Sequence, residues 1–199
     1  MLSCMILAFG LSAPIELNPL TDEELLPKDP KERLLWVLNS REFPRLYLRE
    51  LLELAPKQVP ELIRLLESES LKTYSFARAT IVIPKLGDQR FQFVPLVKAR
   101  LLDKQAAIRL AAIECMKEFQ GPEYRAVILP LIADPDWTTA CAAGRAMAEV
   151  GTFKELRDMR NWIEQQGKLQ KPHDATPEIK KYADLLEGRL KNAEKPANK

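Results

Sequence analysis

Histidine is nearly missing from this sequence, which has a single one, His173, among 199 residues. Because histidine is the commonest side chain for metal binding and for proton transfer near neutral pH, a catalytic or metal site would depend almost wholly on carboxylates. His173 lies in a polar segment and is predicted to be an exposed linker residue. The sequence also contains no glycine-rich phosphate loop and no G-x-S-x-G elbow. We therefore predict a protein that is not an enzyme and that needs no metal and no cofactor.

A clear excess of charge of one sign is also missing. Lys and Arg together number 30 and Asp and Glu number 28, which leaves a net charge of only +2. Proteins that bind nucleic acids usually carry a clustered basic excess, because their lysines and arginines neutralise phosphates. No nucleic-acid partner is therefore expected.

Glycine is scarce, with 7 residues, and no segment alternates apolar and polar residues as a half-buried strand would. Apolar residues recur instead at helical spacing along nearly the whole chain. With 46% hydrophobic residues, the chain can also bury a sizeable core. These features predict an all-α fold.

Cysteine is rare and its count is odd: Cys4, Cys115 and Cys141. No two of them have the spacing of metal ligands. Cys115 and Cys141 lie in alanine-rich helical stretches, where cysteine usually acts as a small buried hydrophobic residue. We expect both to be buried thiols with neither a disulfide nor a redox role.

An apolar run from Leu2 to Ala13 precedes Pro14. It has the length of the hydrophobic part of a signal peptide and is too short to cross a bilayer, although no Lys or Arg comes before it. We therefore expect residues 1–20 to be a signal peptide and linker of an exported protein, periplasmic or secreted. The alternative is a cytoplasmic protein in which this run packs on the first helices.

The stretch from Leu101 to Gly151 contains the same pattern twice. Asp103 is followed 31 residues later by Asp134, and the Ala111-Ala112 pair is followed at the same distance by Ala142-Ala143. Each copy consists of an apolar helix, a turn with an aspartate and an alanine-rich helix. Repetition at such a period is typical of an array of helix pairs, each of which buries its apolar face against the next.

Prolines and capping residues mark the ends of the predicted helices. Asp29-Pro30-Lys31-Glu32 has the form of a capping box with proline at the first helical position. Pro84 should shorten the helix that contains it, and Gly87 suits the left-handed position past its end. After a first helix that begins at Pro30 and one that begins at Pro44, the expected helices are 60–67, 71–85, 94–102, 105–119, 124–133, 137–150, 152–166 and a last one from Thr176.

The paired helices resemble HEAT-like repeats, in particular the short bacterial form also seen in phycobilisome-lyase-like proteins. The motifs that carry this resemblance over roughly residues 59–151 are Leu86-Gly87-Asp88, Asp103, Ile108-Arg109, Ala111-Ala112 and Ala142-Ala143. The sequence departs from the pattern at Thr139-Ala140 and at Pro84. We expect a right-handed α-solenoid of stacked antiparallel helix pairs over residues 21–167, a linker at 168–175, and a C-terminal helix and tail at 176–199.

The same resemblance implies that Asp103 and Arg109 form a ladder of charge-assisted bonds between repeats. Gly144 lies in the middle of a predicted helix, where we expect a close approach of backbone to backbone. Helical spacing predicts that a binding surface is formed by the outward-facing side chains Lys72, Arg78, Glu114, Lys117, Arg145 and Glu149. Glu114 and Arg145, one repeat apart, should be neighbours.

Trp137 directly follows the Asp134-Pro135-Asp136 turn. It is either an anchor for a partner, since aromatic residues are enriched in protein interfaces, or a residue that fastens the start of its helix. We interpret the chain as a non-catalytic scaffold for protein–protein interaction. The two alternatives are a lyase-type or chaperone-type factor for a chromophore or modified protein, suggested only by the family resemblance, and a HEAT-like DNA-binding or repair protein.

Overall fold

The computed structural model describes residues 26–40, 45–68 and 72–194. Within these ranges the chain forms ten α-helices and four short 3-10 segments and contains no strand. The predicted all-α class is therefore confirmed. The predicted signal peptide and linker at residues 1–20 lie outside the described residues, as do Cys4 and residues 195–199 of the predicted tail.

The helices follow one another with short connections. The α-helices are α1 (Pro30–Asn39), α2 (Arg45–Leu54), α3 (Val59–Glu67), α4 (Thr73–Val82), α5 (Val94–Arg100), α6 (Ala106–Lys117), α7 (Pro122–Ile128), α8 (Trp137–Val150), α9 (Phe153–Gly167) and α10 (Thr176–Ala193). The 3-10 segments are η1 (Ala55–Lys57), η2 (Ile83–Lys85), η3 (Gly87–Phe93) and η4 (Leu129–Ala133).

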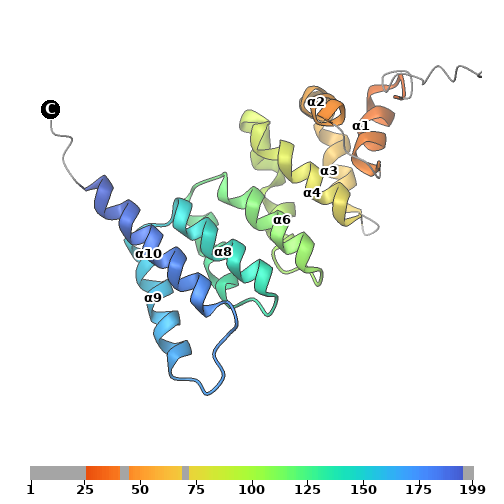
Figure 1. Cartoon of the computed structure of the whole chain (residues 1–199). Helices are drawn as coiled ribbons and strands as arrows, with labels where there is room; N and C mark the ends of the chain where they lie inside the picture. Colours follow the sequence, from red (N-terminus) through yellow and green to blue (C-terminus); the bar gives the residue numbers. More distant parts are fainter. Residues whose placement is uncertain (1–25, 41–44, 69–71, 195–199) are drawn as a thin grey trace, which may run out of the picture.

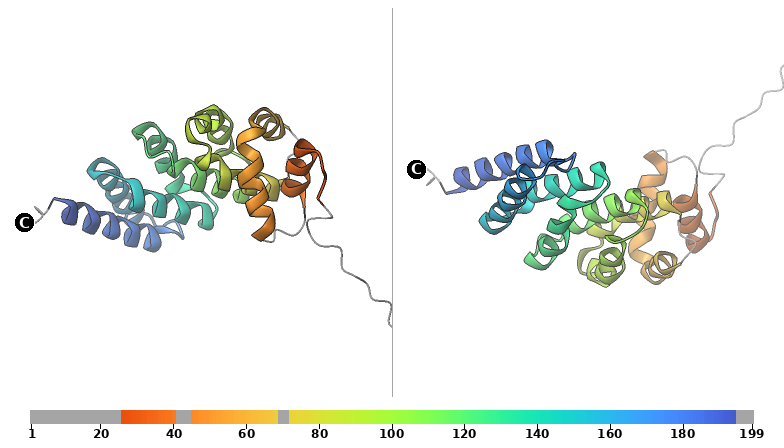
Figure 2. Two further views of the ribbon diagram at one scale, coloured as in Figure 1. Left: turned by 90° about the horizontal axis from the view of Figure 1, so that it is seen from above. Right: turned by 90° about the horizontal axis from the view of Figure 1, so that it is seen from below.

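Helices α4, α6, α8 and α10 lie side by side in one row (Figure 1), and each packs against the next. A second layer contains α5, α7 with η4, and α9, which pack against α6, α8 and α10 (Figure 2). At the N-terminal end, α1 packs against both α2 and α4. The described part of the chain is elongated, with α1 and the end of α10 at opposite ends (Figure 1).

Caps and helix breakers fix where these helices begin and end. The Asp29 carboxylate accepts hydrogen bonds from the backbone N–H groups of Lys31 (3.0 Å) and Glu32 (2.8 Å), as expected for the cap of α1. Helix α4 ends at Val82, and Pro84 lies in the 3-10 segment that follows. Gly87 has a φ angle of +57°, so the prediction of a left-handed residue past this helix is confirmed.

Helices α6 and α8, which pack against each other, both contain buried alanines. Ala112 and Ala143 are completely buried, and Ala111 and Ala142 are nearly so. Small side chains allow two helices to approach closely, which agrees with the predicted role of these alanines. Cys115 and Cys141 are both buried free thiols, as predicted, and burial raises the pKa of the Cys115 thiol to about 12.

Gly144 lies where α10 crosses α8. A Cβ atom at this position would lie 2.6 Å from Cδ1 of Ile179 and 2.9 Å from Cδ2 of Tyr182. A close approach is therefore present, but it is made by side chains of α10 and not by the backbone approach that was predicted. Gly188, in the middle of α10, differs because an added Cβ would have no described atom within 4 Å.

Arg109 joins two successive helix pairs. It donates hydrogen bonds from Nε (2.8 Å) and Nη2 (2.7 Å) to the two carboxylate oxygens of Asp134, and from Nη1 to the backbone carbonyl of Asp103 (2.8 Å). The Asp103 carboxylate is paired with Arg100 at 3.2 Å. Arg109 therefore forms the expected link between pairs, but its carboxylate partner is Asp134, and Asp103 contributes only a backbone oxygen.

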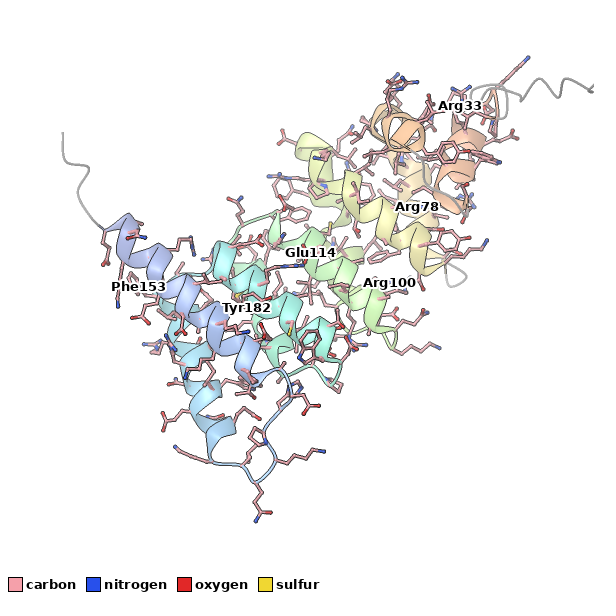
Figure 3. The ribbon with its side chains drawn as sticks, viewed as in Figure 1. Arg33, Arg78, Arg100, Glu114, Phe153 and Tyr182 are labelled. Atoms are coloured by element: carbon pink, nitrogen blue, oxygen red, sulfur yellow. The ribbon has the colours of Figure 1, made fainter. Side chains whose placement is uncertain are left out.

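Arg78 was predicted to point outward, and this prediction is wrong. Its side chain is buried, with 7% of the residue exposed, and Nη1 donates to the carbonyl oxygens of Val37 (3.1 Å), Leu38 (3.0 Å) and Ser40. The last carbonyls of a helix have no partner within the helix and carry partial negative charge, so the end of α1 is a natural site for a guanidinium group. Figure 3 shows Arg78 in the row beside α1.

Two other arginines make the same kind of contact. Arg189 of α10 donates to the carbonyls of Ala148 (3.1 Å) and Gly151 at the end of α8, and Arg100 of α5 donates to the carbonyl of Leu66 (3.2 Å) near the end of α3. Each bond joins elements that are 34 to 41 residues apart in the chain. Arginine side chains thus fasten the ends of helices to their neighbours.

The glycines of α8 and α10 provide a matched test of the close approach. The change Gly188→Ala should raise the free energy of unfolding by about 0.5–1 kcal/mol, because alanine favours the helix and nothing opposes its methyl group. Gly144→Ala should instead lower it by about 1–3 kcal/mol, since the methyl group would overlap Ile179 and Tyr182. Chemical denaturation measures both values. Equal stabilisation by the two substitutions would contradict the packing of α10 on α8.

Replacement of Arg78 tests the link between α1 and α4. Arg78→Met keeps most of the apolar stem but leaves buried carbonyls without a donor, so the free energy of unfolding should fall by about 2–4 kcal/mol. Arg157→Met is the matched control, because the Arg157 side chain is 72% exposed and should tolerate the change within about 0.5 kcal/mol. Similar stability changes in both variants would show that the buried bonds contribute little.

Candidate functional site

A shallow groove runs along α8 between α6 and α10. Its main hollow has a volume of about 320 Å³ and is continued toward the start of α6 by a smaller one of about 180 Å³. The two hollows share Leu110 and Thr138. We call this feature the α8 groove. Its lining residues are Ala106, Ala107, Leu110, Asp136, Trp137, Thr138, Cys141, Ala142, Arg145 and Tyr182.

The groove arises from the sizes of the side chains on three neighbouring helices. Thr138, Cys141 and Ala142 lie on one face of α8 at helical spacing and are small, so they form a low floor. Leu110 of α6 and Tyr182 of α10 are larger and line the groove on either side of this floor. Tyr182 also reaches across Gly144, as described above. Because residue 144 is glycine, Tyr182 can lie close to α8 and form one wall of the groove.

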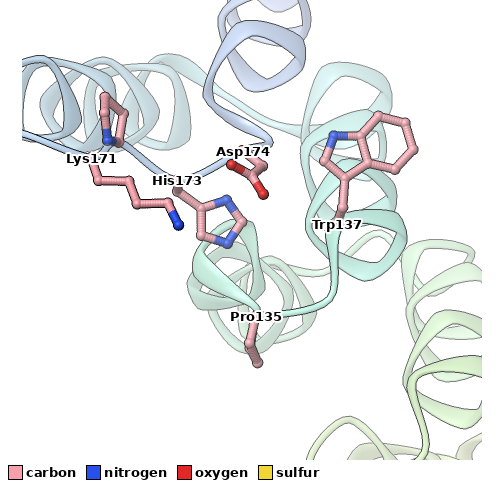
Figure 4. Close-up of a pocket in the computed structure, with 6 residues that line it drawn as sticks. Pro135, Trp137, Lys171, His173 and Asp174 are labelled. Carbon is pink, nitrogen blue, oxygen red and sulfur yellow. The ribbon is translucent and has the colours of Figure 1, made fainter.

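Trp137 lies where the α8 groove meets another hollow. Half of the residue, 50%, is exposed, although Trp137 is the first residue of α8. It also lines a hollow of about 220 Å³ between the η4–α8 turn and the loop that joins α9 to α10 (Figure 4). Pro135, Lys171, Pro172, His173 and Asp174 complete that lining. An aromatic side chain exposed at a junction of two hollows can contact a bound molecule on either side.

His173 is more constrained than the sequence suggests. Its Nδ1 atom accepts a hydrogen bond from the backbone N–H of Ala175 (3.1 Å), so Nε2 carries the proton and donates to the carbonyl of Asp134 (2.8 Å). Its ring also lies edge-on to Trp162, with 5.9 Å between ring centroids. The prediction of an exposed linker residue is wrong, because His173 anchors the α9–α10 loop to the turn before α8.

Four charged side chains form a network on α6 and α8, and one of them, Arg145, also lines the groove. Arg145 forms an ion pair with Glu114, which confirms that these residues are neighbours. Lys117 lies between two carboxylates, 2.9 Å from Glu114 and 2.8 Å from Glu149. The network contains two positive and two negative charges, so they cancel. Figure 3 shows the position of Glu114 on the row.

The predicted binding surface is therefore only partly assembled. Glu114, Lys117, Arg145 and Glu149 form one network, and Arg145 lines the α8 groove together with Trp137. Lys117 does not point freely outward as predicted, because its ion pairs leave only 15% of the side chain exposed. Lys72 is exposed before α4, with its Nζ atom 5.6 Å from the centre of the Tyr74 ring. Arg78 belongs to the interior.

Leu110, Cys141 and Tyr182 were not predicted as groove residues. Helical spacing places Tyr182 on the apolar stripe of α10, and such a stripe does not show which of its members will be only partly covered. The sequence signal for a groove would be a small residue at a position where the equivalent residue of the other copy of the pattern is large. The same difference in size also occurs in tightly packed cores, so it does not identify a groove.

Comparison of the chain with protein-family models, curated proteins and solved structures finds no match. In the described ranges, no helix has the length and apolar character needed to cross a membrane. No cluster of three or more His, Cys, Asp or Glu residues is arranged to hold a metal ion in the same ranges. A function must therefore be inferred from the geometry of the chain.

Titration of Glu114 tests the charge network. Burial raises the pKa of Glu114, but its bonds to Lys117 and Arg145 outweigh this effect, so the pKa lies below its ordinary value of 4.5. A lowered pKa stabilises the fold above the ordinary value, and this stabilisation is lost as the pH falls through the lowered pKa. Glu114→Gln should therefore cost about 0.5–1 kcal/mol at pH 7 and much less near pH 3. Denaturation curves at both pH values measure the change, and a cost independent of pH would exclude an electrostatic origin.

Proposed function

We propose that this protein is a non-catalytic scaffold that binds a protein partner through the α8 groove. The observation that carries the proposal is the half-exposed Trp137 at the end of a groove with a largely apolar lining. Protein interfaces are enriched in aromatic residues and arginines at their centres and are depleted of other charged residues there. The α8 groove offers Trp137, Tyr182 and Arg145 in this arrangement.

We further propose that the two layers are a right-handed α-solenoid of HEAT-like repeats. Its support is the equivalence of Asp103 and Asp134, which lie 31 residues apart. Each carboxylate accepts a hydrogen bond at 2.9 Å from the backbone N–H two residues later, at Gln105 and at Asp136. The same local device thus starts α6 and α8. Stacked repeats present their second helices as a continuous surface, which is where scaffolds of this kind bind partners.

The shape of the groove favours a partner segment with one large apolar side chain. A hollow of about 320 Å³ lies at the lower end of the range of ligand sites, about 300–1,000 Å³. The floor of Cys141 and Ala142 offers few hydrogen-bonding groups, so an apolar side chain loses little there when it leaves water. The indole of Trp137 can pack against the same side chain.

The charge network on α6 and α8 disfavours the DNA-binding alternative. Arg145 and Lys117 are already paired with carboxylates on the same surface. Binding of a phosphate backbone requires several lysines or arginines that are able to neutralise phosphates and release counterions. The charge network provides none without first breaking its own ion pairs. The lyase-type alternative has no observation in its favour beyond the family resemblance.

Selection from a library of displayed peptides tests the proposal. Peptides enriched on the native protein should share a large apolar residue and should bind Trp137→Ser at least about tenfold more weakly, as expected when an interface anchor is removed. Thr138→Glu, which places a charge on the groove floor, should have the same effect. Phe153→Ser is the matched control, because Phe153 is 49% exposed but lies on α9, and it should leave binding unchanged.

Two results would argue against this function. Equal loss of peptide binding in the Phe153→Ser control would show that the α8 groove is not the site. Retention of duplex DNA with a steep dependence on salt would favour the nucleic-acid alternative instead.

A further inference from the structure

A second and larger groove lies in the other layer, between α5 and α7 with η4. It has a volume of about 640 Å³, and Lys98 is the only charged residue among the described residues that line it. The other lining residues are Pro95, Ala99, Leu101, Leu102, Ala126, Val127, Pro130 and Leu131. We call it the α5–α7 groove. No residue of the α8 groove contributes to it, and an inference about it does not depend on the proposed function.

Leu102 is the most exposed of the large apolar residues in the described ranges, with 84% of its surface in contact with solvent. The repeat explains why this exposure is unusual. Ala133 stands 31 residues after Leu102, just before the equivalent aspartate, and it too is exposed. The fold therefore accepts alanine at this position and does not need a large side chain there. An apolar side chain that is not required by the core and that borders an apolar groove suggests a contact with another molecule.

The position of Leu102 beside the groove makes this surface complementary to itself. When a projecting side chain lies next to a hollow, a second copy related by a two-fold axis can fill the hollow with its own projecting side chain. The same contact is then made in both directions. We propose that the α5–α7 groove is the interface of a homodimer, in which Leu102 of each copy enters the groove of the other.

The charges at the two ends of the groove fit this arrangement. Helices α5 and α7 both pack against α6, to which short turns join them, so they run in the same direction. Lys104 follows the C-terminal end of α5, and Glu123 lies in the first turn of α7, so they lie at opposite ends of the groove. A two-fold axis perpendicular to α5 and α7 reverses one copy and brings Lys104 toward Glu123 of the other copy, twice in each dimer.

Neither Lys104 nor Glu123 has an ion-pair partner among the described residues. Both residues are exposed. Lys98, within the groove, can lay its apolar stem along the contact and keep its ammonium group at the edge in water. The paired helices form a limited patch, so we expect a dissociation constant of about 1–100 μM.

Sedimentation equilibrium of the full chain, from about 1 μM to about 500 μM, tests the dimer across this range of affinities. The native protein should convert from monomer to dimer as its concentration rises. Leu102→Ala, which copies the residue at 133, should weaken dimerisation at least about tenfold, because two leucine side chains lose their buried site. Thermal unfolding of the variant under monomeric conditions should be unchanged. Leu169→Ala is the matched control, since Leu169 is 53% exposed but lies in the α9–α10 loop.

A charge exchange tests the two-fold geometry directly. Lys104→Glu and Glu123→Lys should each weaken self-association several-fold at low salt, because each creates two pairs of like charges in the homodimer. An equimolar mixture of the two variants should recover dimers, since every cross-subunit pair in the heterodimer then has opposite charges. A native protein that stays monomeric throughout, or association unaffected by Leu102→Ala, would overturn the proposal. If the mixture associates no more strongly than the separate variants, the two-fold pairing of Lys104 with Glu123 is contradicted.

Discussion

The structure depends on guanidinium groups that satisfy the ends of neighbouring helices. A helix leaves its last carbonyls without partners, and a short helix has a large share of its backbone at the ends. Arg78 and Arg189 supply donors to such carbonyls across more than 35 residues of sequence, and Arg109 binds both a backbone oxygen and the Asp134 carboxylate. One arginine can do this for several acceptors at once, because its donors form a fixed planar fork. Apolar packing brings the helices together, and these bonds fix which ends meet.

Much of the helical framework could be predicted from the sequence because its signals are local. Helix α8 runs over the predicted residues 137–150, and the effects of Pro84 and Gly87 follow from backbone chemistry that needs no knowledge of distant residues. Arg78 and His173 were misjudged for the opposite reason. Each donates a hydrogen bond to a backbone carbonyl about 40 residues away in the chain. Every residue has a backbone carbonyl, so the amino-acid sequence does not show which one will be the acceptor. A polar residue in a helix or loop was therefore taken to face water.

The groove along α8 could be predicted only in part. Trp137 and Arg145 were identified, but the walls Leu110 and Tyr182 become visible only when α10 is placed across Gly144. The Glu114–Arg145 neighbourhood was predictable because it repeats the period of 31 residues and joins equivalent faces of α6 and α8. The 31-residue period therefore predicts contacts between equivalent positions of α6 and α8. A groove depends instead on the sizes of side chains, which can differ between positions that are equivalent in the period.

Among the described residues, the main helix contacts join elements that are near neighbours along the chain: each member of the row packs on the next, and α1 packs mainly on α2 and α4. Folding of such an arrangement does not require the two ends of the polypeptide to find one another, which keeps the loop-closure entropy small. In the proposed solenoid, structure can form first at any well-packed helix pair and then spread by one pair at a time. Loosening at the α1 end should consequently leave α8 and α10 folded, so the molecule is expected to melt from its ends inward.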